Sequence, residues 1–188
     1  MKSGLLNRFL WPAVAVAALF GVFMFALHRI GSGELVVSEI PSPLIGKPAP
    51  AIDLPAIAGP SARFTSASML GRPWLLNVWG TWCPACREEH GALMQLSATI
   101  GIPIIGLDWK DDANAALAWL DSLGNPYASV PFDPLGKTAI DYGVYGAPET
   151  FLIGADGKVL AKFIGPITVE AWETKLKPKL AAAGGLPQ

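Results

Sequence analysis

The position of the two cysteines, between a short apolar segment and a segment typical of a helix, constrains the fold of this chain most. Residues 74–79 (WLLNVW) have the composition of a buried strand, and residues 84–99 begin with a proline, which suits the first turn of a helix. Cys83 and Cys86 lie at the junction, with two residues between them. The sequence therefore predicts a strand, a cysteine pair and a helix in direct succession.

This placement suits thiol–disulfide exchange. Unpaired backbone N–H groups and the positive end of the helix dipole stabilise a thiolate at Cys83. Cys86 is three residues further on and on the same side, so the two sulfurs can close a small disulfide ring. Pro84 pre-sets the helical φ angle at a position where its missing N–H has no partner. We expect Cys83 to attack a disulfide of a partner and Cys86 to release that partner; the reverse sequence would oxidise a dithiol.

Two other interpretations of the cysteine pair stay open. A purely structural bridge is one, although so short a loop contributes little chain entropy. A metal site is the other, and it would combine Cys83, Cys86 and His90, since the last two are four residues apart on the predicted helix. We expect His90 to be partly exposed without a ligand role, and we predict neither a metal nor a cofactor.

Trp82 is either a packing residue or part of an apolar docking surface beside the sulfur, whereas Trp79 is expected in the core.

The rest of the chain alternates strand-like and helix-like segments. A second strand is expected at residues 102–107, and a second helix from Asp111 or Asp112 to Leu123. The remaining expected elements are a short helix at 137–142, a hairpin of residues 150–154 and 158–164 around 155–157, and a final helix from Val169 that Pro178 disturbs. This order predicts a mixed β-sheet flanked by helices, which is the arrangement of the thioredoxin-like α/β fold.

The N-terminus contains a different kind of segment. Residues 9–27 form a 19-residue apolar run without a charge, which as a helix would extend about 28 Å, close to the thickness of a bilayer core. No small-x-small cleavage site follows the run, and no polar residue recurs at a helical period. An uncleaved transmembrane helix is therefore favoured over a cleaved signal peptide or a core helix. Lys2 and Arg8 precede the run, which favours a cytoplasmic N-terminus and an exported domain.

These observations divide the chain into four predicted parts. Residues 1–8 form the cytoplasmic N-terminus, residues 9–27 the anchor, residues 28–50 a linker rich in Pro and Gly, and residues 51–188 the thioredoxin-like domain. Beyond residue 30 the chain carries 11 basic and 15 acidic residues without a basic run, which argues against a nucleic-acid partner.

A second motif lies in residues 143–153 (GVYGAPETFLI). Pro148 immediately precedes a predicted strand, where a cis peptide bond is usable. Together with residues 79–86 (WGTWCPAC), this motif resembles the membrane-anchored, thioredoxin-like proteins of the CcmG/DsbE family of cytochrome c maturation. The similarity runs from about Pro43 through the C-terminal helix and includes residues 125–127 (NPY).

The resemblance implies a periplasmic thiol:disulfide protein, held in the bacterial inner membrane by its anchor. Such proteins reduce apocytochrome c or one of its maturation factors and are recharged by a membrane electron carrier. By matching position, Cys83 is the nucleophile, Cys86 the resolving thiol, and Pro148 the cis-proline that faces them. Glu89 and Glu149 match acids that flank the active site in this family.

Without the family resemblance, the positions of Glu89 and Glu149 in the sequence do not indicate a functional role. From spacing alone, Glu89 would be one of two adjacent acids on a helix surface and Glu149 an exposed loop charge. The family match favours a functional role for Glu149 and leaves both interpretations of Glu89 open. Gly154 departs from the family pattern, in which Asp is common at that position.

The direction of exchange also stays open. A protein-disulfide reductase is favoured, because only 61 residues separate Cys86 from Pro148 and an oxidase would usually insert a further helical domain there. The alternatives are an exported disulfide oxidase and a thioredoxin-fold copper carrier, for which His90 is the only histidine within the predicted thioredoxin-like domain.

Overall fold

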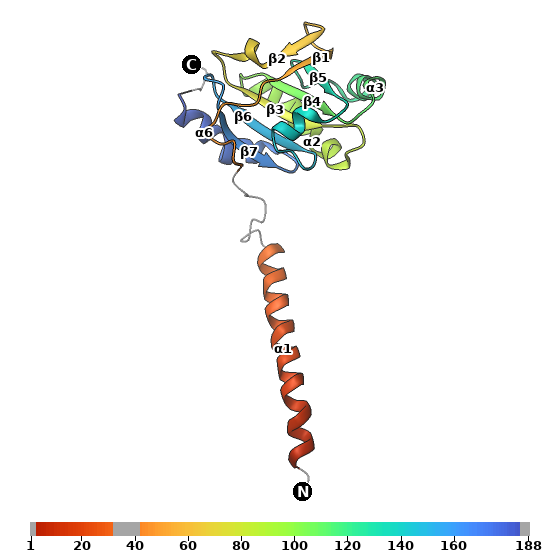
Figure 1. Cartoon of the computed structure of the whole chain (residues 1–188), viewed down its shortest axis with the longest axis vertical. Helices are drawn as coiled ribbons and strands as arrows, with labels where there is room; N and C mark the ends of the chain where they lie inside the picture. Colours follow the sequence, from red (N-terminus) through yellow and green to blue (C-terminus); the bar gives the residue numbers. More distant parts are fainter. Residues whose placement is uncertain (1–2, 32–41, 185–188) are drawn as a thin grey trace. The chain divides into compact units, whose positions relative to one another are not determined.

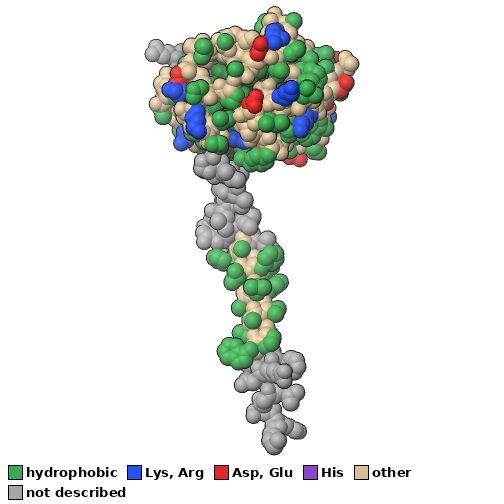
Figure 2. All heavy atoms as spheres, viewed as in Figure 1, with side chains coloured by type: hydrophobic (Ala, Val, Ile, Leu, Met, Phe, Trp, Pro, Cys, Tyr) green, Lys and Arg blue, Asp and Glu red, His purple; other side chains and the backbone are tan. Residues whose placement is uncertain are grey.

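The computed structural model describes residues 3–31 and 42–184, and the chain forms two compact units, residues 1–40 and 41–188 (Figure 1). In the first unit, helix α1 extends over Ser3–Gly31. Figure 2 shows apolar side chains along its described part. Among the residues described, no helix combines the length and the apolar character needed to cross a membrane.

The second unit is built on a mixed sheet of seven strands within residues 42–184, in the order β2-β1-β5-β4-β3-β6-β7 (Figure 1). The three central strands β5, β4 and β3 are parallel, and an antiparallel pair of strands extends the sheet on each side. The strands are β1 (Asp53–Ala58), β2 (Arg63–Thr65), β3 (Trp74–Trp79), β4 (Ile104–Trp109), β5 (Val130–Asp133), β6 (Glu149–Ile153) and β7 (Val159–Ile164).

Helices cover both faces of this sheet. They are η1 (Ser66–Met69), α2 (Pro84–Thr99), α3 (Ala113–Leu123), α4 (Lys137–Asp141), α5 (Val169–Ala171), η2 (Trp172–Leu176) and α6 (Lys177–Ala182). Side chains alternate along β3, so Leu75 and Trp79 pack in one core with α2, α3 and the C-terminal helices. Leu76 and Val78 pack in the other core with α4 and the strand pair β1–β2. The predicted thioredoxin-like fold is confirmed.

Strand β3 and helix α2 have the predicted bounds. The second predicted strand starts two residues later, at Ile104, after Pro103, which has no N–H for a ladder. Asp112, and not Asp111, caps α3 by accepting from two backbone N–H groups at 3.0 Å. The chain thus reaches the helix through an additional short loop, residues 110–112.

Strands β1, β2 and β5 were not predicted. Pro55 in β1 and Pro131 in β5 are atypical of strands, because proline cannot donate to a ladder. Pro55 pairs with Arg63 of β2, which is the edge strand. Pro131 pairs with Ala56, where the register of β1 with β5 shifts before Ala58. Such irregular pairing accommodates proline without losing the strand.

The predicted linker at residues 28–50 differs from what the structure shows. Residues 32–41 lie outside the described part, whereas residues 42–50 belong to the second unit. Gly46 donates to the carbonyl of Val159 at 2.8 Å, and the N–H of Val159 donates back to Lys47 at 3.0 Å. These residues pair with the edge strand β7. The prolines in this segment are therefore compatible with a place at the edge of the sheet and do not mark a linker.

The final predicted helix is divided into three parts. A five-residue π segment, η2, separates α5 from α6, and Pro178 lies in the first turn of α6. Because Pro178 lacks an N–H, the preceding turn cannot keep the regular i→i−4 pattern and widens. Trp172 and Leu176 are nevertheless buried in the core, as expected.

Candidate active site

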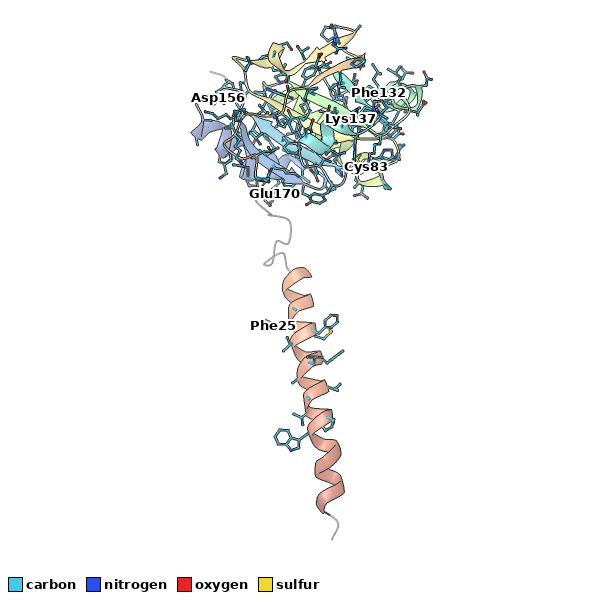
Figure 3. The ribbon with its side chains drawn as sticks, in the orientation of Figure 1. Phe25, Cys83, Phe132, Lys137, Asp156 and Glu170 are labelled. Carbon is cyan, nitrogen blue, oxygen red and sulfur yellow. A yellow bond between two sulfur atoms is a disulfide. The ribbon has the colours of Figure 1, made fainter. Side chains whose placement is uncertain are left out.

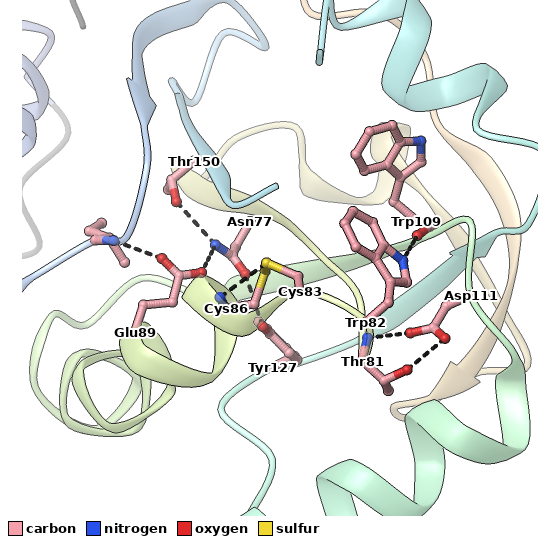
Figure 4. The surroundings of a disulfide bond; sticks show 11 residues. Asn77, Thr81, Trp82, Cys83, Cys86, Glu89, Trp109, Asp111, Tyr127 and Thr150 are labelled. Atoms are coloured by element: carbon pink, nitrogen blue, oxygen red, sulfur yellow. Dashed lines mark hydrogen bonds between the residues drawn. A yellow bond between two sulfur atoms is a disulfide. The ribbon is translucent and has the colours of Figure 1, made fainter. Parts of the chain in front are cut away.

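The two cysteines form a disulfide at the N-terminal end of α2 (Figures 3 and 4). Their Cα atoms are 5.3 Å apart. Cys83 is the N-cap, and its Sγ accepts a hydrogen bond of 3.1 Å from the backbone N–H of Cys86. Since N–H groups at a helix N-terminus stabilise negative charge, the same arrangement favours a thiolate at Cys83 after reduction. Pro84 occupies the first turn, as predicted.

Glu89 lies one turn along α2 from Cys86 and is buried, with 2% of its surface exposed (Figure 4). The interpretation of Glu89 as a surface acid is therefore wrong. Its Oε1 accepts from the Asn77 amide at 2.9 Å, and its Oε2 accepts from the backbone N–H of Ile167 at 2.7 Å. Burial raises the pKa of Glu89 to about 7, although both hydrogen bonds oppose the rise. At neutral pH this carboxyl group can both hold and release a proton.

Asn77 connects Glu89 to two further side chains. Its amide also donates to Thr150 Oγ1 at 3.1 Å, and its Oδ1 accepts from the Tyr127 hydroxyl at 2.9 Å (Figure 4). Burial raises the pKa of Tyr127, and the negative charges of Glu89 and Asp108 add to the effect. Asn77 was not predicted as a site residue, although a polar residue in the middle of an apolar strand was a visible signal.

The loop before β6 contains the second motif. The peptide bond between Ala147 and Pro148 is cis, and Ala147 packs against the core that contains both cysteines. Glu149 is 1% exposed and not a loop charge on the surface. Its Oε2 lies 2.8 Å from Nζ of Lys162, which also donates to the carbonyl of Gly143 at 2.9 Å. Lys162, a partner that the sequence analysis missed, thus joins β7 to this loop.

The two tryptophans near the disulfide have different environments. Trp79 is fully buried and stacks on Tyr127 with ring centroids 5.4 Å apart, which confirms its expected place in the core. Trp82 immediately precedes Cys83 and is 49% exposed. Its position is that of a residue which a docking partner can contact.

His90 differs from expectation. It is only 5% exposed, and its Nε2 lies 3.2 Å from the carbonyl oxygen of Leu123. The ring packs edge-on against Trp119 with centroids 4.4 Å apart, so α3 covers it. Burial lowers the pKa of His90. In the described ranges 3–31 and 42–184, no group of three or more His, Cys, Asp or Glu side chains is arranged to hold a metal ion.

A further buried acid, Asp108, lies near the end of β4 and was not singled out from the sequence. It is fully buried, and no described residue donates a hydrogen bond to either carboxylate oxygen. Burial first, and then the nearby carboxylates of Asp111 and Asp112, raise the pKa of Asp108 to about 8. The neutral form of Asp108 is therefore favoured at neutral pH.

Known proteins resemble this chain over most of its length. Residues 44–177 match the Redoxin family. The thiol:disulfide interchange protein DsbE of Pseudomonas aeruginosa is 49% identical over 159 residues, which cover 84% of this chain and 88% of that protein. DsbE of Allochromatium vinosum is 40% identical over 182 residues, 96% of this chain and 97% of that protein. A crystal structure of a protein assigned as DsbE from Chlorobium tepidum superposes with a TM-score of 0.61 at 28% identity, covering 72% of this chain and 94% of the other.

The fold, the disulfide at the start of α2 and the cis-proline define a thioredoxin-like thiol:disulfide oxidoreductase. The similarity to the DsbE proteins extends far beyond the two cysteines, over nearly the whole length of each relative. The chain belongs to the DsbE (CcmG) family of thiol:disulfide interchange proteins, as the motifs in the sequence indicated.

Proposed function

We propose that this protein reduces disulfides of apocytochrome c, or of a cytochrome c maturation factor, in the periplasm. The observation that carries the proposal is the Cys83–Cys86 disulfide at the N-terminus of α2, with the buried Glu89 one turn away. The names of the DsbE relatives support interchange chemistry, and the family resemblance of residues 143–153 supports the cytochrome c substrate.

The exchange proceeds in two displacements. The Cys83 thiolate attacks one sulfur of the partner's disulfide, so that a mixed disulfide forms and the other sulfur leaves as a thiolate that takes up a proton. Cys86 then loses its proton and attacks Sγ of Cys83, which releases the second sulfur of the partner. Two electrons pass to the partner and the Cys83–Cys86 disulfide is formed; one of the two protons that the partner gains comes from Cys86, and the other comes from the solvent, to which Cys83 released its own on becoming a thiolate.

Glu89 is the proposed acceptor for the proton of Cys86. A thiol becomes a useful nucleophile only when it is deprotonated, and a general base acts best when its pKa is near the working pH. The pKa of Glu89, raised by burial to about 7, satisfies this condition. The proton can then be returned to the departing partner thiolate.

The remaining site residues have proposed roles in binding. Pro148 and the residues before it present backbone to an extended segment of the partner, while Trp82 offers an apolar contact beside the sulfur. Glu149, with its charge neutralised by Lys162, holds this loop on β7. None of these groups takes part in bond exchange itself.

We also propose that residues 9–27 anchor the protein in the inner membrane, with residues 1–8 in the cytoplasm and the thioredoxin-like domain in the periplasm. The uncharged apolar run and the basic residues before it support this arrangement. A membrane electron carrier would then recharge the disulfide to the dithiol after each reaction.

Trapping of the mixed disulfide tests the proposed function. The reduced Cys86→Ser variant of the full chain is mixed with an oxidised peptide whose intramolecular disulfide lies in a Cys-x-x-Cys-His sequence, the haem-attachment pattern. We expect a covalent adduct that dithiothreitol removes, and none with Cys83→Ser. If Cys86→Ser forms no adduct, the assignment of Cys83 as the nucleophile is contradicted.

A further inference from the structure

The short loop between β4 and α3 contacts the residues directly before Cys83. The Asp111 carboxylate accepts hydrogen bonds from both the backbone N–H and the hydroxyl of Thr81, the latter at 2.7 Å (Figure 4). Its Oδ1 also accepts from the backbone N–H of Asp112 at 2.8 Å. Both carboxylate oxygens are therefore used, and two of the three donor groups belong to the loop that precedes the reactive cysteine.

The same two loops are joined a second time through Trp82. The indole Nε1–H of Trp82 donates to the backbone carbonyl of Trp109 at 3.1 Å (Figure 4). The two indole rings pack edge to face with centroids 5.6 Å apart. Trp82 therefore has a fixed orientation even though half of its surface is exposed.

The backbone of both loops is restricted around Trp82, at Gly80 in one loop and at Lys110 in the other. A Cβ atom on Gly80 would lie 2.5 Å from Nε1 of Trp82, so glycine is needed for the indole to fold over the backbone there. Lys110 has a φ of 51°, a left-handed conformation that non-glycine residues seldom adopt. Backbone strain of this kind persists where the surrounding structure holds it and is typical of functional sites.

We propose that Asp111 is a positioning residue for disulfide exchange, which acts through Thr81 to hold Trp82 as a rigid contact surface for the partner's disulfide-bearing segment. This inference rests on the proposed function, because it requires that a polypeptide docks beside Cys83. Asp111 does not contact the sulfur atoms in the described structure; its effect passes through the residues that precede Cys83. Holding an exposed side chain in its binding orientation lowers the conformational cost of docking.

If Asp111 positions Trp82, its loss should affect the reaction with a polypeptide but not the reaction with a small thiol. A polypeptide must contact Trp82 to bind, whereas dithiothreitol needs only access to the disulfide. Loosening Trp82 should therefore weaken docking of a peptide and leave the reaction with dithiothreitol unchanged. A merely structural role of Asp111 would change both reactions together, because it would disturb the disulfide as well.

Four variants of the full chain separate these possibilities. Asp111→Asn leaves one acceptor oxygen in place of two, and Thr81→Val removes the hydroxyl donor. Thr81→Ser keeps that hydroxyl and serves as the conservative rescue. Asp112→Ser is the matched control, since it removes a neighbouring acid and retains a good N-cap for α3.

The reduced proteins are mixed with increasing concentrations of the oxidised Cys-x-x-Cys-His peptide in a stopped-flow instrument, so that half-saturation concentration and limiting rate are measured separately. We expect Asp111→Asn and Thr81→Val to raise the half-saturation concentration by about tenfold, as for the loss of a hydrogen bond to a charged group. Their limiting rates and the rates at which dithiothreitol reduces the oxidised proteins should equal those of the wild type, and Thr81→Ser and Asp112→Ser should resemble the wild type throughout.

An unchanged half-saturation concentration in Asp111→Asn and Thr81→Val would overturn the positioning role while leaving the proposed function intact. Equal losses in the peptide and dithiothreitol reactions would also overturn it, because they would indicate damage to the disulfide. A wild-type protein that does not react with the peptide, yet is reduced normally by dithiothreitol, would refute the proposed function and the positioning role with it.

Discussion

Replacement of Asp108 by Asn tests the electrostatic description of the buried acid near the end of the central strand β4. Asp108 is fully buried and its carboxylate oxygens accept no hydrogen bond from the described residues. Asn has nearly the same shape and carries no charge at any pH. The substitution therefore removes one ionisation and leaves the packing almost unchanged.

The expected magnitude follows from the pKa of Asp108, which rises from 3.8 in its ordinary state to about 8 in the fold. Between these two values the folded protein keeps the proton that the unfolded chain loses, so the unfolded state is favoured increasingly as pH rises. The slope is about 1.4 kcal/mol per pH unit. Between pH 5 and pH 8, the free energy of unfolding of Asp108→Asn should thus rise by about 4 kcal/mol relative to that of the wild type.

Urea unfolding of both proteins at several pH values, with the disulfide kept oxidised, measures this difference. Asp121→Asn is the matched control, because it replaces an exposed acid on α3 by the same amide. If the difference between Asp108→Asn and the wild type is constant from pH 5 to pH 8, Asp108 is not a protonated buried acid and the reasoning is refuted.

Three further predictions concern Lys162, Glu89 and Gly106. Lys162→Met should lower the free energy of unfolding by about 3–5 kcal/mol, because it leaves the buried Glu149 carboxylate without its cation; Lys162→Arg, measured by the same urea titration, should cost much less. Glu89→Gln should slow the release of a peptide from the mixed disulfide by about 100-fold and abolish the inflection near pH 7 in its pH–rate profile, since below that pH Glu89 is protonated and cannot accept a proton. Gly106→Ala should destabilise the domain by about 1–3 kcal/mol in thermal unfolding, because the new Cβ would lie 2.6 Å from the ring of Tyr127.

A different result would contradict each of these three predictions. Equal destabilisation by Met and Arg at position 162 would show that charge neutralisation of Glu149 is not the important contact. A Glu89→Gln variant that retains the inflection near pH 7 would assign that ionisation to another group. A Gly106→Ala variant as stable as the wild type would show that the Tyr127 ring can move without cost.

The sequence predicted local features of the active site well, because they depend on neighbouring residues. An apolar run before the cysteines and Pro84 after Cys83 determined the bounds of β3 and α2. The turn at residues 155–157 likewise marked the hairpin of β6 and β7. In each case the signal for the element lies within the element or directly beside it.

Features that depend on distant residues could not be predicted in the same way. Asn77 and Thr150 are 73 residues apart and meet only because β3 pairs with β6. The burial of Glu89 likewise depends on Ile167, which is 78 residues away. Spacing along one helix therefore indicated a surface acid where tertiary packing produces a buried one.

The reduction potential of the Cys83–Cys86 pair decides whether the protein reduces or oxidises its partners. The full chain is equilibrated with dithiothreitol or glutathione redox buffers of known potential, and the fraction of disulfide is measured at each. We expect a reducing value, near the ~−270 mV of thioredoxin and well below the ~−120 mV of a strong disulfide oxidant. A value near −120 mV would contradict it, because the protein would then donate its disulfide to partners instead of reducing theirs.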